Sequence, residues 1–163
     1  MTNEKPVSEE KEFTFLCVVD ETEELSQALR FACARASRVG GRVSLLYVIE
    51  PAETQHWASV GDLMRKERRQ EAEEMLSIIS AIVQKRTGKI PLVYIREGVM
   101  HEQLMELIVE ELDISLLVLG AATGTDGPGP LVSYLIQKMA SSLRIPVTVV
   151  PGRLTDEEID EIT

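Results

Sequence analysis

Short apolar runs alternate along the chain with longer segments whose apolar residues recur at helical spacing. Each run is rich in β-branched or aliphatic residues without polar alternation, which is typical of a strand buried on both faces. The runs cover residues 13–19, 43–49, 90–95, 114–119 and 146–150. Because parallel strands need long crossover connections, this alternation predicts a single-domain α/β fold. Its core is an open five-stranded parallel sheet with helices on both faces.

Glycines end the first two amphipathic segments between these runs. The first follows Asp20 and stops at Gly40, and the second stops at Gly88. The apolar residues of the second segment cluster in its later half, so its charged first half is expected to stand away from the core. Asp20, with Glu23 three residues on, is expected to cap the first helix. The helix before the last strand is expected to run to about Leu143.

The chain of 163 residues suits one domain with a sizeable core. We expect a flexible leader at residues 1–12, the α/β domain at 13–152 and an acidic tail at 153–163. In that tail, Thr155 and Glu158 stand in capping-box register, which favours a short final helix. For the strand order 3-2-1-4-5, the winding of the sheet reverses between the first and fourth strands.

The formal net charge of −10 is concentrated at the two ends of the chain. A cationic cluster at residues 65–69 is followed directly by glutamates, which is typical of a solvated helix rather than a nucleic-acid-binding face. No apolar run approaches the ~20 residues that span a bilayer, and residues 1–12 carry no secretion signal. We therefore predict a cytoplasmic protein that binds neither nucleic acid nor membrane. Cys17 and Cys33 have no metal or redox spacing and are predicted to be buried, reduced thiols.

A glycine-rich segment, LGAATGTDGPGPLVSYLIQ, follows the fourth strand at residues 119–137. Ligands of open α/β sheets bind beyond the carboxyl ends of the strands, where the winding reverses, so Asp20 and Gly120 are expected to lie beside a cleft. The glycines would let phosphate approach the backbone, whereas Pro128 and Pro130 each remove one N–H donor. No P-loop, complete dinucleotide fingerprint or Ser-His-acid set occurs, so no catalytic residue and no metal ligand is predicted.

The order and spacing of several segments resemble the universal stress protein family. These segments are VVDETEELSQALRFA, VSLLYVIEP, REG followed by EQLMELIVEELDISLLVLG, and IPVTVV, and the resemblance extends from residue 13 to residue 151. It implies a Rossmann-like, adenine nucleotide alpha hydrolase-like fold, a stress-response function and pairing of two copies through the last strand. The apolar last strand favours the same homodimer, because a bare sheet edge invites pairing with another chain.

The nucleotide-binding branch of this family holds ATP at the ends of the first, second and fourth strands. The resemblance therefore implies a cofactor, ATP with magnesium, whose adenine and ribose would lie at Val18, Val19, Asp20 and Val48.

The phosphate motif of that branch is only partly present. The motif is a glycine, two residues, a second glycine, nine residues, and then glycine followed by serine or threonine. Counted from Gly120, Thr123 takes the place of the second glycine, Gly124 lies one residue late, and the final pair becomes Ser133 and Tyr134. The Tyr134 ring is expected either to lie near the phosphate path or to point away. Replacing Gly120 by a β-branched residue is expected to abolish ATP binding and to leave the fold intact.

Two functions stay open at this point. One is a regulator that binds an adenine nucleotide, and the other is a dimeric interaction or signalling module of the same fold without a nucleotide. An ATP-consuming enzyme is disfavoured because no base or lysine for phosphoryl transfer is evident, although slow hydrolysis remains compatible with the sequence. His56 and Trp57 either stack on a bound base or pack the connection that carries them.

Overall fold

Five strands form one parallel sheet in the order β3-β2-β1-β4-β5 in the computed structural model, which describes residues 11–51, 58–139 and 141–163. The predicted α/β fold and strand order are confirmed. The leader up to residue 10, His56 and Trp57 lie outside the described residues. The strands are β1 Thr14–Val18, β2 Arg42–Ile49, β3 Leu92–Glu97, β4 Ile114–Ala121 and β5 Val147–Pro151.

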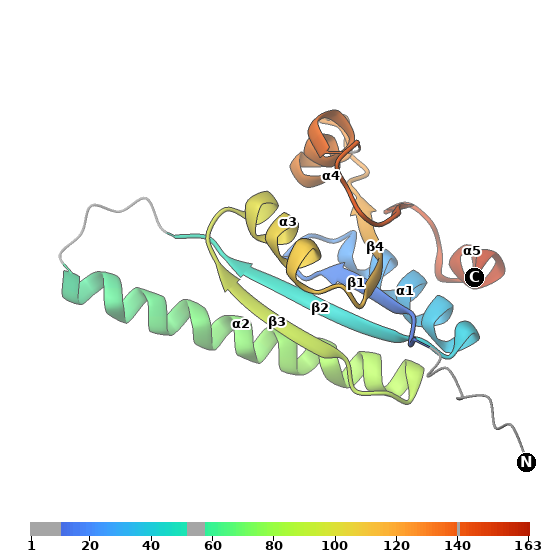
Figure 1. Ribbon diagram of the computed structural model, residues 1–163, viewed down its shortest axis with the longest axis horizontal. Coiled ribbons are helices and arrows are strands. Elements are labelled where there is room, and N and C mark those ends of the chain that lie inside the picture. The colour runs from blue at the N-terminus through green and yellow to red at the C-terminus, as the bar shows by residue number, and fades with distance from the viewer. Residues whose placement is uncertain (1–10, 52–57, 140) are drawn as a thin grey trace, which may run out of the picture.

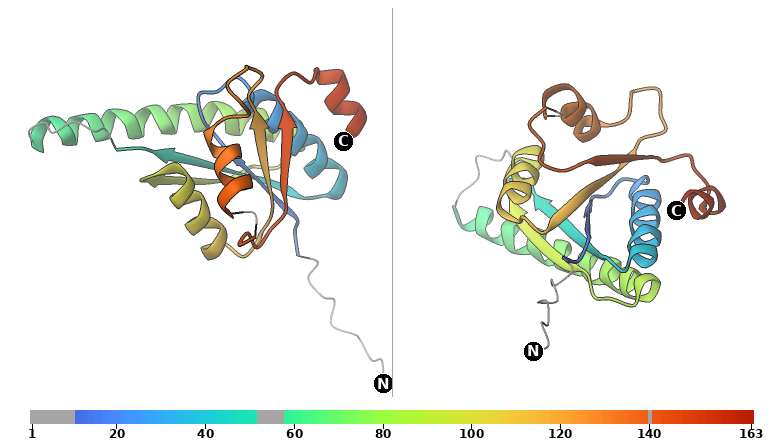
Figure 2. Two further views of the ribbon diagram at one scale, coloured as in Figure 1. Left: turned by 90° about the horizontal axis from the view of Figure 1, so that it is seen from above. Right: turned by 45° about the vertical axis from the view of Figure 1, so that its right-hand side comes forward.

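Helices cover both faces of this sheet (Figures 1 and 2). On one face lie α1 Leu25–Val39, α2 Ala58–Thr87 and α5 Asp156–Ile162. On the other lie α3 Met100–Glu110 and α4 Pro130–Tyr134, which continues as the π-helical turn Leu135–Met139. The sheet therefore separates two apolar cores, as expected of a doubly wound α/β fold.

The central strand β1 contributes to both cores, since all five of its residues are buried. Cys17 points into the core under α1, where it lies with Cys33 of that helix. Both cysteines are buried and free, as predicted from their spacing. Burial raises the pKa of both thiols, that of Cys33 to about 11, because a thiolate is poorly solvated in an apolar core.

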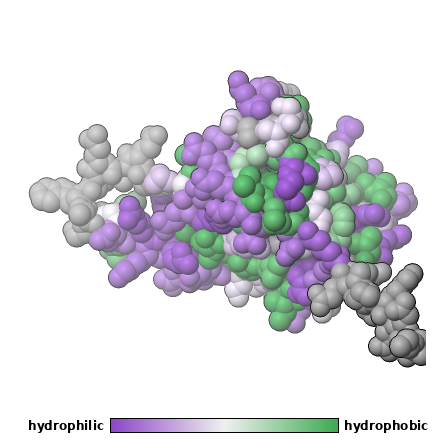
Figure 3. Space-filling model, in the orientation of Figure 1, coloured by the Kyte–Doolittle hydropathy of each residue, from purple (hydrophilic) through white to green (hydrophobic). Residues whose placement is uncertain are grey.

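Helix α2 extends beyond the sheet at its amino-terminal end (Figure 1). Among its described side chains, the buried ones, Ala72, Leu76 and Val83, lie from the middle of the helix onward, whereas Leu63 in the first half is 59% exposed. Figure 3 shows mainly hydrophilic side chains along the projecting part on the face in view. The predicted separation of a charged first half from the core is confirmed. No helix in the described part of the chain is long and apolar enough to cross a membrane.

The start of α1 differs from the prediction. The residue at the N-cap position is Glu24, which makes no side-chain cap, and the helix begins at Leu25. Asp20 lies four residues earlier, where its Oδ1 accepts hydrogen bonds from the N–H, at 3.0 Å, and the hydroxyl of Thr22. The predicted cap is wrong because the chain turns through residues 21–24 before the helix starts.

The segment before β5 is also shorter than predicted, because its helical part ends at Met139 rather than near Leu143. The chain then turns into β5, and the guanidinium of Arg144 holds this turn. It donates to the carbonyl oxygens of Ile108, Glu111 and Ile114 at 2.8, 3.1 and 3.3 Å, around the carboxyl end of α3. A cation there is favourable because the last carbonyls of a helix lack intrahelical partners.

The tail helix α5 packs against α1. Thr155 and Glu158 form the capping box that starts it, with both reciprocal bonds at 3.2 Å. Its Ile159 is fully buried. Arg30 of α1 donates two hydrogen bonds, of 2.9 and 2.7 Å, to the carboxylate of Asp160. That contact holds the pKa of Asp160 below its ordinary value.

Candidate ligand-binding cleft

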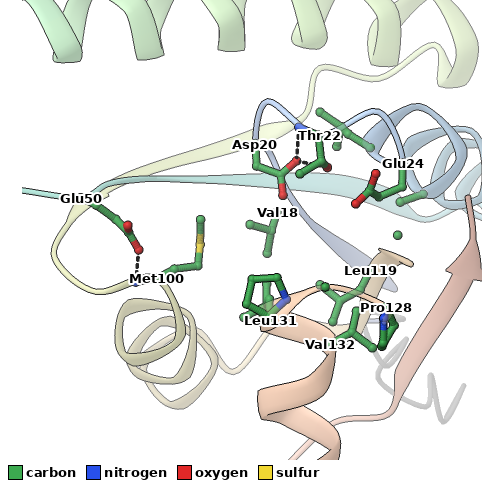
Figure 4. Close-up of a pocket in the computed structure, with 15 residues that line it drawn as sticks. Val18, Asp20, Thr22, Glu24, Glu50, Met100, Leu119, Pro128, Leu131 and Val132 are labelled. Carbon is green, nitrogen blue, oxygen red and sulfur yellow. Dashed lines mark hydrogen bonds between the residues drawn. The ribbon is translucent and has the colours of Figure 1, made fainter. Parts of the chain in front are cut away.

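A cleft opens where the neighbouring strands β1 and β4 end (Figure 4). After β1 the chain turns toward α1 on one face of the sheet, and after β4 it leads to α4 on the other. The two connections diverge at this point, which is where the winding of the sheet reverses. The space between them has a volume of about 240 Å³. It therefore lies where the sequence predicts a cleft beside Asp20 and Gly120.

The walls of the cleft are mostly apolar. Val18 and Leu119 come from the ends of the two strands, and Leu131 and Val132 come from α4 (Figure 4). Leu25, Ala28, Met100, Pro128 and Pro130 complete these walls. Flat apolar groups such as purine rings suit such a lining, in which a few polar side chains set the orientation.

Three carboxylates border the cleft, those of Asp20, Glu24 and Glu50. Asp20 accepts the two bonds from Thr22 described above. Glu50, directly after β2, accepts a hydrogen bond of 3.2 Å from the N–H of Met100 at the start of α3 (Figure 4). A carboxylate is favourable there because the first N–H groups of a helix are otherwise unpaired. Among the described residues, none that lines the cleft is Lys, Arg or His, and none forms a group suited to a metal ion.

Gly120 brings the connection after β1 close to the end of β4. A Cβ atom built on Gly120 would lie 2.5 Å from the carbonyl oxygen of Glu24 and 2.9 Å from its Cβ. A Cβ on Gly152 would likewise lie 3.1 Å from the Cβ of Glu24. Glu24 is thus packed between the ends of β4 and β5, and glycine is needed at residue 120 for this close approach.

Of the residues expected at adenine and ribose, two line the cleft and two are buried in the cores. Val18 and Asp20 line the cleft. Val19 is buried in the core under α1, and its N–H donates to the carbonyl oxygen of Leu46 at 2.7 Å. Val48 is buried in the core on the opposite face and does not line the cleft.

The residues expected at the phosphates lie mostly outside the cleft, with only Gly120 in its lining. Thr123 and Gly124 are exposed. The N–H of Ser133 donates to the carbonyl oxygen of Gly129 at 3.0 Å. The Tyr134 ring lies against His101, with centroids 4.0 Å apart. Tyr134 does not line the cleft.

The sequence interpretation missed several residues of the cleft, most notably Glu24 and Glu50. A signal for Glu50 was available, because it directly follows a predicted strand and the carboxyl ends of parallel strands share one edge of the sheet. No comparable signal marked Glu24, whose position depends on contacts with Gly120 and Gly152 more than ninety residues away.

The fold and cleft define a doubly wound α/β protein with a cavity at the reversal point of its sheet. The sequence model of the universal stress protein family matches residues 13–151. The chain therefore belongs to the universal stress protein family. A search of curated proteins found no match to this chain.

Solved structures of the family share this fold. The universal stress protein UspA from Lactobacillus plantarum is 18% identical, with a TM-score of 0.71 over 86% of this chain and 98% of that one. A universal stress protein in complex with cAMP is 14% identical, with a TM-score of 0.62 over 87% and 98%. One from Archaeoglobus fulgidus in complex with dAMP is 18% identical, with a TM-score of 0.56 over 86% and 98%.

Proposed function

We propose that this chain is a cytoplasmic, non-catalytic regulatory protein of stress responses that binds an adenine nucleotide in the β1/β4 cleft. One observation carries the proposal: an apolar cavity lies at the reversal point of the sheet and is bordered by side-chain carboxylates. The cAMP and dAMP complexes of two proteins with this fold support an adenine ligand. Binding changes the population of protein conformations that partners recognise, and no bond of the ligand needs to break.

The adenosine part of such a ligand suits the residues of the cleft. Val18, Leu119 and Leu131 offer apolar surface for the base. Asp20 and Glu24 offer carboxylate oxygens, which accept hydrogen bonds from donors such as sugar hydroxyls or an exocyclic amine.

The triphosphate part, with magnesium, does not suit the same lining. Phosphate sites use converging backbone N–H groups and cationic side chains. Here Pro128 and Pro130 have no N–H, and no cationic side chain lines the cleft within the described part of the chain. We therefore assign binding to the adenosine moiety.

Filling the cleft is expected to abolish binding. Leu131→Trp places a larger side chain in the wall of the cleft. Isothermal titration calorimetry with adenosine and AMP is expected to show heat of binding for the natural chain and none for this variant. Ile136→Trp is the matched control, because Ile136 lies in the next helical turn, is 62% exposed and does not line the cleft. Equal affinity of all three proteins would place the ligand elsewhere, and no binding to the natural chain would contradict the proposed function.

A dimeric interaction module without a nucleotide is the second candidate. Strand β5 pairs with β4 and is the last strand in the order of the sheet, so one edge of its backbone faces outward. Val149 at this edge is 36% exposed. Unpaired strand edges bind other strands readily. We propose that two copies pair through β5, and this surface would serve either function.

A charge on β5 is expected to prevent that pairing. Lysine on an edge strand disfavours strand addition, so Val149→Lys should convert the dimer to a monomer in analytical ultracentrifugation. Val93→Lys is the control, because Val93 has a similar exposure of 43% on β3 at the opposite edge. A dimer that persists in Val149→Lys, or is lost in Val93→Lys, would place the interface elsewhere.

A further inference from the structure

Several hydrogen-bond donors around the cleft have partners within the chain. The N–H and hydroxyl of Thr22 donate to Asp20, and the N–H of Met100 donates to Glu50. In the connection after β4, the N–H of Ala122 donates to the carbonyl oxygen of Pro128 at 3.0 Å. The chain's own carboxylates and carbonyls thus occupy donors that an anionic ligand would need.

Glu24 contributes a carboxylate of a different kind. The Glu24 side chain makes no hydrogen bond or ion pair with the described residues, and Glu24 lines the cleft (Figure 4). Its backbone is held by close packing against Gly120 and Gly152. A carboxylate whose oxygens are available accepts hydrogen bonds from a ligand but repels a second anion.

Two cationic side chains of the neighbouring elements are engaged outside the cleft. Arg68 of α2 donates to the carbonyl oxygen of Glu50 at 2.6 Å, yet Arg68 does not line the cleft. Arg96, at the end of β3, is paired with Glu110. The charge presented to a ligand inside the cleft therefore comes from Asp20, Glu24 and Glu50.

We infer that the cleft selects against phosphate, so that among adenine ligands it prefers those with the least phosphate charge. This inference rests on the proposed function and specifies the ligand class of the same site. Each added phosphate brings negative charge toward three carboxylates and meets no cationic side chain in the described lining of the cleft. Affinity therefore falls from adenosine to AMP to ATP. Like-charge contacts of this kind are a common means by which proteins exclude unwanted ligands.

Calorimetry of the full chain with adenosine, AMP and ATP tests this order. At low salt we expect adenosine to bind at least about tenfold more tightly than ATP, because like charges at a partly desolvated site repel strongly. The ratio is expected to shrink as sodium chloride screens the repulsion. Addition of Mg²⁺ with ATP tests whether a metal ion removes the discrimination.

The Glu24→Gln variant tests the role of this carboxylate. Glutamine has the same shape, so the packing against Gly120 is preserved. The variant should bind adenosine more weakly and ATP more tightly than the natural chain does. The ratio of the adenosine affinity to the ATP affinity should fall by about threefold or more, since one of three like charges is removed. Glu23→Gln is the matched control, because it removes the same charge one residue away and Glu23 does not line the cleft. Equal thermal melting of the three proteins shows that the fold is unchanged.

The outcomes separate the inference from the proposed function. ATP binding more tightly than adenosine, with or without Mg²⁺, overturns the inference and leaves the proposed adenine-nucleotide function standing. An affinity ratio that is equal in Glu24→Gln and Glu23→Gln also overturns it. Absence of binding by all three ligands overturns both.

Discussion

The Gly120→Ala variant is expected to have a free energy of unfolding about 3 kcal/mol lower than that of the natural chain. This loss is at the upper end of the usual range for forcing extra volume into a packed site. Its Cβ would lie 2.5 Å from the carbonyl oxygen of Glu24, so backbone must move. Urea denaturation followed by circular dichroism measures the loss. Because displacing Glu24 also moves a border of the cleft, ligand affinity should fall together with stability.

Gly124→Ala is the matched control in the same connection. A Cβ on Gly124 has no atom within 4 Å, and the residue is not among the glycines with positive φ. This variant is expected to change stability by less than about 1 kcal/mol, with a gain favoured because alanine restricts the unfolded chain. Equal stability of both variants would contradict the close packing at Gly120. The same packing contradicts the sequence-based expectation that a β-branched residue at Gly120 would leave the fold intact.

The Ile159→Ala variant is expected to lose about 2–4 kcal/mol of unfolding free energy, the usual range for truncating a fully buried isoleucine. Ile159 is 0% exposed and joins the core under α1. It lies outside the residues 13–151 that the family model matches, so this helix adds to the core from beyond the matched region. Thermal and urea unfolding measure the loss.

Ile162→Ala removes the same atoms from the same helix at a position that is 60% exposed. It should change stability by no more than about 0.5 kcal/mol, as is usual for surface positions. A loss of similar size in both variants would show that α5 contributes through its helical propensity and not through burial. A loss in neither would show that α5 is not docked in solution.

Local patterns in the sequence determined most of the fold. Apolar runs marked the strands, and the αL glycines Gly40 and Gly88 ended the first two helices as predicted. Pro91 directly precedes the edge strand β3, which begins at Leu92, and this place suits a residue that cannot donate to a ladder. These signals depend on residues close in the chain, and for that reason they could be read without the structure.

The sequence by itself thus determined the sheet, its covering helices and the place of the cleft beside Asp20 and Gly120. The tertiary structure decided what surrounds that cleft. It places Glu24 against Gly120, turns the Tyr134 ring toward His101 and uses Asp20 as the acceptor for Thr22 instead of as a helix cap. Most of these contacts join residues far apart in the chain, and each depends on which conformation packs best. The local periodicity of apolar residues does not indicate which conformation that is.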